Sequence, residues 1–173
     1  NGHLEVVKFL VLCGADVHAY SDNNDALKCA SINGHLEVVQ FLVSQGADAN
    51  ASDALVWASH NGYLEVVKSL VLGGADIHAN YGYALTWASE NGHLDVAKFL
   101  VSKGADVHDD NDEALICASM YNHLEVVKFL ISNGANIHAR KDKALGWASK
   151  NGHLGVVKFL ISNGANIHAR KDK

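Results

Sequence analysis

The chain has 173 residues, of which 49% are hydrophobic, and this fraction is ample for a continuous core. Its formal net charge of −5 argues against nucleic-acid binding, which needs a basic surface. Its longest apolar runs last only a few residues, far short of the roughly 18 that span a membrane. The three cysteines lack paired spacing, so they form no disulfide framework and indicate an intracellular protein of the cytoplasm or nucleus.

The segment Asn-Gly-His-Leu-Glu-Val-Val recurs along the chain with a period near 30. It stands at residues 1–7 and 33–39, and variants of it begin at Asn61, Asn91, Tyr121 and Asn151. A fixed period of this size is typical of stacked-repeat proteins, in which each unit buries its apolar face against its neighbours. We therefore predict an elongated all-α array that presents a surface to a partner.

In chain order the array divides into a partial repeat and five further repeats, about 5.5 in all. The predicted boundaries are 1–24, 25–52, 53–82, 83–112, 113–142 and 143–173. Because the chain opens inside a repeat and shows no capping repeats, we expect a piece of a longer array. We expect the full-length protein to be monomeric and this piece to associate through its uncapped ends.

Residues 84–111 illustrate one repeat. Residues 84–91 are rich in helix formers and predict a first helix of about two turns, which ends at Gly92 because glycine adopts positive φ at little cost. Residues 93–103 predict a second helix, with apolar side chains at helical spacing, that ends at Gly104. A polar loop follows. The predicted unit is helix, tight turn, helix and protruding loop.

The pattern Leu-x-x-Ala-x-x-x-Gly-His-Leu-Glu-Val-Val, followed by Gly-Ala-Asp, resembles the ankyrin repeat over the whole chain. The family's Thr-Pro-Leu-His entry to the first helix is absent, and the period is shorter than the family's because residues are missing at the loop tip. The resemblance implies an ankyrin-type solenoid with short finger loops. The short, proline-free repeats further resemble ankyrin proteins of large DNA viruses that infect amoebae, which implies a host-cell location.

Histidine and cysteine are the residues that invite a metal or catalytic interpretation. Ten of the histidines form two columns, one after the inter-helix glycine and one after Gly-Ala-Asp/Asn-x. Stacked repeats lie roughly 10 Å apart, too far for a shared metal ion, so we expect structural hydrogen bonds and no cofactor. Cys29 and Cys117 occupy a slot that holds Trp57, Trp87 and Trp147 in other repeats, and we expect these cysteines to be small core residues.

Positions that differ between repeats are the best candidates for partner binding, because shared positions serve stacking. One variable row lies two residues before the inter-helix glycine slot and contains Ile32, His60, Glu90, Met120 and Lys150, with Tyr121 beside Met120. The resemblance places these first-helix ends on the concave surface. Ile32, Met120 and Tyr121 are apolar where a solvated helix end would be polar, so they indicate either partner contacts or buried structural residues.

The loop tips form a second variable row, from an aromatic finger with Tyr81 and Tyr83 to an acidic finger with Asp110 and Glu113. The next finger is basic, with Arg140 and Lys141. Tyrosine is favoured in binding hot spots, so we expect Tyr81 and Tyr83 to anchor a partner and the charged tips to orient it. Alternatively, the tips are merely solvated, or the acidic and basic fingers pair with each other.

The array also contains a predicted weak joint near residues 50–72. Ser69 replaces the phenylalanine found at Phe41 and Phe99, and the loss of a large packed side chain can cost several kcal/mol.

We therefore expect a non-catalytic scaffold that binds another protein, neither nucleic acid nor membrane, through its concave face and loop tips. The alternative is a structural array that stacks or coats an assembly without a discrete ligand.

Overall fold

The computed structural model describes residues 2–17, 26–50 and 53–169, and this part of the chain is helical, without strands. Its helices are α1 (Leu4–Leu12), α2 (Ala26–Ile32), α3 (Leu36–Ser44), α4 (Ala54–His60), α5 (Leu64–Leu72), α6 (Ala79–Glu90), α7 (Leu94–Ser102), α8 (Asp109–Met120), α9 (Leu124–Ser132), α10 (Ala139–Lys150) and α11 (Leu154–Ser162).

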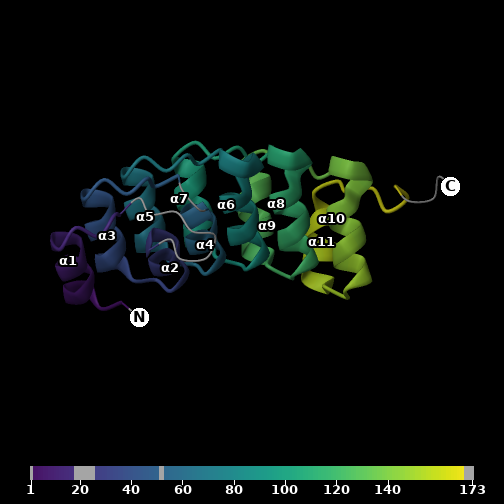
Figure 1. Cartoon of the computed structure of the whole chain (residues 1–173). Coiled ribbons are helices and arrows are strands. Elements are labelled where there is room, and N and C mark those ends of the chain that lie inside the picture. The colour runs from purple at the N-terminus through teal and green to yellow at the C-terminus, as the bar shows by residue number, and fades with distance from the viewer. Residues whose placement is uncertain (1, 18–25, 51–52, 170–173) are drawn as a thin grey trace.

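The helices form two layers that run the length of an elongated molecule (Figure 1). Helices α2, α4, α6, α8 and α10 contact one another in sequence and make up the first-helix layer. Helices α1, α3, α5, α7, α9 and α11 contact one another in the same way and make up the second-helix layer. This arrangement confirms the predicted all-α solenoid.

The tight turn between paired helices follows from glycine, as predicted. Gly92 has a φ of 75°, and the backbone N–H of His93 donates to the carbonyl of Ala88 at 2.9 Å, which closes α6. Asn122 holds the same slot with a φ of 68°, a conformation that asparagine tolerates better than most residues.

The core lies between the two layers. In α7, Val96, Ala97 and Leu100 are at most 1% exposed, and the equivalent residues of the neighbouring repeats are similarly buried. Burying an aliphatic side chain of this size contributes roughly 1.5–3 kcal/mol, so the repeats hold together chiefly through these apolar contacts.

The finger loops are short left-handed turns rather than β-hairpins. Residues 80–82 have φ values of 53°, 58° and 70°, and residues 110–112 and 140–142 are also left-handed, so the right-handed part of each first helix begins just after them. The side chain of Asp112 supports such a turn, because its Oδ1 accepts from His108 Nδ1 at 3.0 Å and from the backbone N–H of Asn136 at 2.7 Å. The tips at 20–25, 52 and 170–173 lie outside the described residues.

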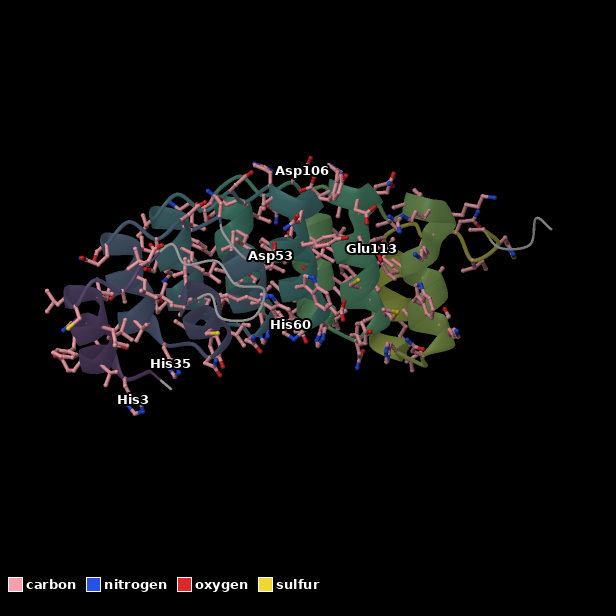
Figure 2. The ribbon with its side chains drawn as sticks, in the orientation of Figure 1. His3, His35, Asp53, His60, Asp106 and Glu113 are labelled. Carbon is pink, nitrogen blue, oxygen red and sulfur yellow. The ribbon has the colours of Figure 1, made fainter. Side chains whose placement is uncertain are left out.

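Histidines of the first column hydrogen-bond to the preceding repeat, as expected. His93 Nε2 donates to the carbonyl of His60 at 2.9 Å, and His153 Nε2 donates to that of Met120 at 2.8 Å. The ring of His93 also lies so close to Gly62 that a Cβ there would collide with it. The glycine slot therefore serves both the turn and the close approach of the next repeat. His3 and His35 lie along one edge of the array (Figure 2).

Two expectations about buried residues need correction. Cys117 is buried, with 5% of its surface exposed, but Cys29 is exposed, so the slot that they share is not a core position in every repeat. The slot of Ser69 is only half-buried in the other repeats, where it holds Phe41 and Phe99, so the missing ring leaves a smaller gap than a core position would.

Candidate partner-binding face

The variable row at the first-helix ends is joined to the following repeat through its main chain. The next repeat supplies a donor to the helix-end carbonyls of three members of the row: Asn61 Nδ2 to Ile32 at 3.3 Å, His93 Nε2 to His60 at 2.9 Å, and Asn151 Nδ2 to Met120 at 2.9 Å. These carbonyls would otherwise lack partners inside their own helices. Stacking therefore uses the main chain at Ile32 and Met120 and leaves those side chains for other contacts, whereas the His60 side chain itself bonds to Asn91 of the next repeat.

A pocket of about 290 Å³ opens between the outer faces of α4 and α6. We call it the aromatic pocket. From the α4 side it is lined by Asp53, Val56, Trp57 and His60, which have the i, i+3, i+4, i+7 spacing of one helix face. From the α6 side it is lined by Asn80, Tyr83 and Trp87. Figure 2 shows Asp53 and His60 at opposite ends of α4.

The walls of the aromatic pocket hold one another in place. The His60 ring packs edge-on between the two indoles, with centroid distances of 5.8 Å to Trp57 and 5.1 Å to Trp87. Asn91 Nδ2 donates to His60 Nδ1 at 3.0 Å, which fixes the imidazole. Asp53 accepts from Asn80 Nδ2 at 2.6 Å and so joins the two sides of the pocket at its rim. A pocket formed in advance loses less conformational entropy on binding.

The predicted tyrosines and the helix-end row occupy different parts of this face. Tyr83 is 42% exposed and lines the aromatic pocket, whereas Tyr81 is 77% exposed at the finger tip and is not part of the lining. Tyr121 is 49% exposed, in the next repeat along. In the helix-end row, four of the predicted residues are half-buried, namely Ile32, His60, Glu90 and Met120, and Lys150 is exposed.

The charged fingers contact each other, which was the alternative considered for them. Arg140 donates to Asp110 Oδ1 and to Glu113 Oε2, both at 2.6 Å, and also to the carbonyl of Asp110 at 2.6 Å. Lys141 is exposed. A partner would therefore meet a largely neutralised cluster at Asp110, Glu113 and Arg140.

The family model for ankyrin repeats (3 copies) matches residues 1–81, 55–141 and 85–171. The chain belongs to the ankyrin-repeat family. Ankyrin repeats are generally protein–protein interaction modules, and the fold is typical of non-catalytic scaffolds. No curated protein matches the chain.

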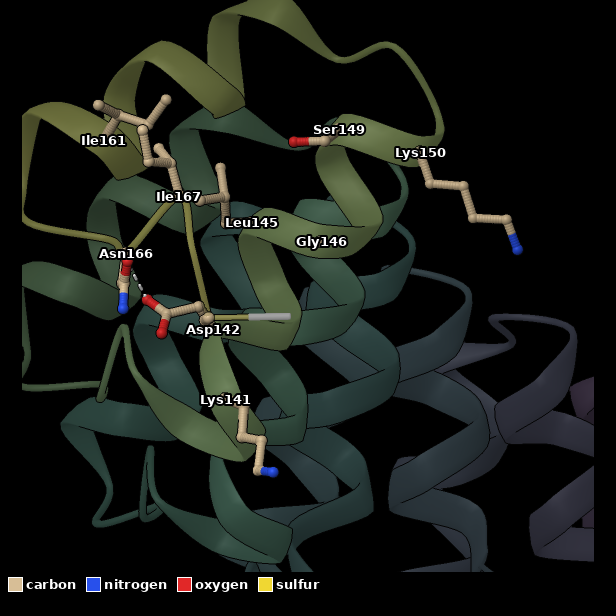
Figure 3. Close-up of a pocket in the computed structure, with 10 residues that line it drawn as sticks. Lys141, Asp142, Leu145, Gly146, Ser149, Lys150, Ile161, Asn166 and Ile167 are labelled. Carbon is tan, nitrogen blue, oxygen red and sulfur yellow. Dashed lines mark hydrogen bonds between the residues drawn. The ribbon is translucent and has the colours of Figure 1, made fainter. Parts of the chain in front are cut away.

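The last ankyrin repeat exposes apolar surface that the inner repeats bury. A pocket of about 480 Å³ lies there, lined by Leu145, Ile161, Ile167 and neighbouring polar residues (Figure 3). Ile167 is 62% exposed, whereas Ile137, its equivalent one repeat earlier, is half-buried against the next repeat. At the other end of the array, Phe9 is 65% and Leu12 is 85% exposed. Such surfaces suit the stacking of a further repeat rather than a small ligand.

Two tryptophans that line the pocket, Trp57 and Trp87, are absent from the sequence-based candidates. They share a slot with Cys29 and Cys117, which were predicted to be core residues, although the slot also varies between repeats. The spacing of Asp53, Trp57 and His60 along one helix face is a signal that could have identified the pocket.

In residues 2–17, 26–50 and 53–169, no three His, Cys, Asp or Glu side chains gather as metal ligands would. None of the helices in the described ranges has the length and hydropathy of a membrane span.

Proposed function

We propose that this ankyrin array is a non-catalytic scaffold that binds a partner protein through its first-helix layer and finger tips, centred on the aromatic pocket. The observation that carries the proposal is the preformed set of three rings around one cavity, of which Trp57 and Tyr83 are exposed and Trp87 is half-buried. Tryptophan and tyrosine dominate binding hot spots, because they bury a large area at little conformational cost.

The surrounding residues supply the rest of the proposed surface. Tyr81 extends from the finger beside the pocket, and Glu90, Met120 and Tyr121 continue along the same layer toward the C-terminal repeats. The partner is oriented by the charged cluster at Asp110, Glu113 and Arg140, whose paired groups are still partly exposed to solvent. Lys141 lies beside this cluster and is exposed. Ile32 and Lys150 lie at the two ends of the row.

Photo-crosslinking tests this assignment. A photoreactive amino acid is placed at Tyr81 or Tyr121 on the proposed surface, and at Lys98 or Lys128, both exposed on the second-helix layer, as matched controls. We expect one discrete protein to crosslink at Tyr81 and Tyr121 but not at the lysine positions. Equal labelling at all four positions, or labelling only at Lys98 and Lys128, would rule out the proposed face.

The alternative, an array that assembles end to end, is favoured by the apolar side chains exposed at both ends, such as Leu12 and Ile167. Under that alternative, crosslinks from Leu12 and Ile167 join copies of this chain, and no other protein is labelled at Tyr81.

A further inference from the structure

The aromatic pocket has the composition of a site for an organic cation. Its lining offers the indoles of Trp57 and Trp87 and the phenol ring of Tyr83, together with the carboxylate of Asp53. None of the lining residues is lysine or arginine. An aromatic face attracts a cation through its quadrupole, and tryptophan does so best.

The chain itself contains an example of this contact in the same slot. Trp147 occupies in the fifth full repeat the slot that Trp57 and Trp87 occupy in the second and third. The Nζ of Lys150 lies over the Trp147 ring, 4.6 Å from its centroid. Lys150 follows Trp147 by three residues, so the ammonium comes from the same helix. The position that follows Trp57 by three is His60, and Glu90 follows Trp87 by three. Neither repeat supplies its own ammonium to its indole at that position.

Two indoles line one cavity only where tryptophan fills the slot in consecutive repeats. The slot reads Cys29, Trp57, Trp87, Cys117 and Trp147 along the chain. The pair Trp57 and Trp87 is therefore set apart from the isolated Trp147.

We propose that the aromatic pocket binds a lysine side chain of the partner protein, with its ammonium group against the indoles of Trp57 and Trp87 and near the Asp53 carboxylate. This inference rests on the proposed function, because the lysine belongs to the partner. Lysine fits better than arginine, since Asp53 already accepts from Asn80 and offers little of the paired carboxylate geometry that a guanidinium uses.

The three tryptophans give three indole N–H signals in an ¹H–¹⁵N NMR spectrum, which provides an internal control. The chain is titrated with the peptide acetyl-Gly-Lys-Gly-amide and with the same peptide carrying norleucine or arginine in place of lysine. We expect the lysine peptide to shift the Trp57 and Trp87 signals and leave Trp147 unchanged. The norleucine peptide should bind roughly three- to thirtyfold more weakly, the range of one cation–π contact.

Substitutions then locate the site. Trp57→Leu should abolish the shift of Trp87, and Trp57→Phe, which keeps an aromatic face, should retain binding with reduced affinity. Trp147→Leu, the matched change in another repeat, should leave the titration unchanged. Asp53→Asn should weaken the lysine peptide and not the norleucine peptide. Helical circular dichroism establishes that each variant is folded.

Several outcomes would overturn the inference: no shift at Trp57 or Trp87, equal binding of lysine and norleucine peptides, or tighter binding of the arginine peptide. These failures are separable from failure of the proposed function. If the peptide titration fails while Tyr81 and Tyr121 still crosslink to one protein, the scaffold proposal stands and only the lysine assignment is lost.

Discussion

The carboxylate of Asp109 occupies the space in which a side chain at Gly82 would stand. In the next two fingers the position of Gly82 holds Asp112 and Asp142, and the position of Asp109 is taken by alanine in the repeats that follow them. The finger at residues 80–82 therefore has no carboxylate of its own at this position, and the carboxylate of Asp109 from the next repeat fills the space. The replacement is imperfect, because Asp109 Oδ2 is buried without a hydrogen-bond partner. Burial and the nearby Asp106 raise the pKa of Asp109.

This relationship predicts strong coupling between the two positions. Gly82→Asp alone should destabilise the array by about 2–3 kcal/mol, because two carboxylates would compete for one space. Asp109→Ala alone should change the stability by less than about 1 kcal/mol, and the double variant should recover about 2 kcal/mol relative to the sum of the single effects. Urea denaturation of the four proteins measures this, and additive effects would contradict it.

A column of buried serines should respond to substitution in the stabilising direction. Ser59 and Ser89 are fully buried, and their hydroxyl oxygens lack hydrogen-bond partners. Because an unsatisfied buried hydroxyl costs about 1–3 kcal/mol, Ser59→Ala should raise the free energy of unfolding by about 1 kcal/mol. Ser149, the exposed equivalent in the last repeat, serves as the control, and Ser149→Ala should change it by less than about 0.5 kcal/mol. A loss of stability in Ser59→Ala would show that the hydroxyl has a partner after all.

The cysteines should differ in reactivity. Burial, together with the carboxylates of Glu113 and Glu90, raises the pKa of Cys117 to about 12. Since the thiolate is the nucleophile, Cys117 should react with iodoacetamide at pH 8 roughly a hundredfold or more slowly than the exposed Cys13 and Cys29. Mass spectrometry of the peptides reports each rate, and labelling in urea, where the difference should vanish, is the control.

The same shift predicts a stability loss in alkali. The unfolded state releases the Cys117 proton near pH 9.0 and the folded state only near pH 12, so this thiol lowers the free energy of unfolding progressively as the pH rises between these values. Cys117→Ala should remove that contribution. Equal alkaline slopes for the two proteins would contradict the assignment.

Acid should weaken the array through His123. Burial is the main cause that lowers the pKa of His123 below its usual 6.5, and the nearby charges of His93 and His153 lower it further. A hydrogen bond to the backbone of Glu90 partly opposes this shift. The unfolded state therefore takes up a proton first, and the free energy of unfolding should fall as the pH drops below about 6.5. Urea denaturation at several pH values should give a flatter dependence for His123→Gln, whereas His168→Gln, at an exposed histidine, should behave like the native chain.

The joint near residues 50–72 remains a prediction, with a smaller expected effect. Because the slot of Ser69 is half-buried elsewhere, the absent ring costs about 1–2 kcal/mol rather than the 3–5 kcal/mol of a full core position. Hydrogen exchange should show α5 less protected than α7, and Ser69→Phe should reduce the difference. Ser102→Phe, at an exposed position of α7, should not increase the protection of α7. Equal protection of α5 and α7 from hydrogen exchange in the native chain would contradict the predicted weak joint.

Much of the fold follows from the spacing of residues along the chain. The apolar periodicity of residues 93–103 predicted α7, and glycines such as Gly92 predicted the turns, because both signals act within one repeat. The left-handed turns at the fingers could not be predicted in this way. Residues 110–112 are not glycine, and their left-handed turn is supported by a hydrogen bond to the Asp112 side chain from the backbone N–H of Asn136, 24 residues further along the chain.

The site was harder to predict, since exposure depends on neighbouring repeats. Cys117 and Cys29 share a slot, yet only Cys117 is buried, between the carboxylates of two repeats. For the same reason the sequence did not single out Trp57 and Trp87 as binding residues. The pairing of Arg140 with Asp110 likewise joins fingers 30 residues apart, and the sequence offered it only as an alternative.

The helix-end carbonyls also bear on how such a surface can change. Because imidazole and amide groups of the following repeat bond to the main-chain carbonyls of Ile32 and Met120, the side chains at these two positions can change without loss of those inter-repeat hydrogen bonds. Mutations there can alter affinity for a ligand at little thermodynamic penalty to the array. The codons for Ile32 and Met120 are accordingly natural choices for a randomised display library, in which selection would sample new recognition while the framework stays constant.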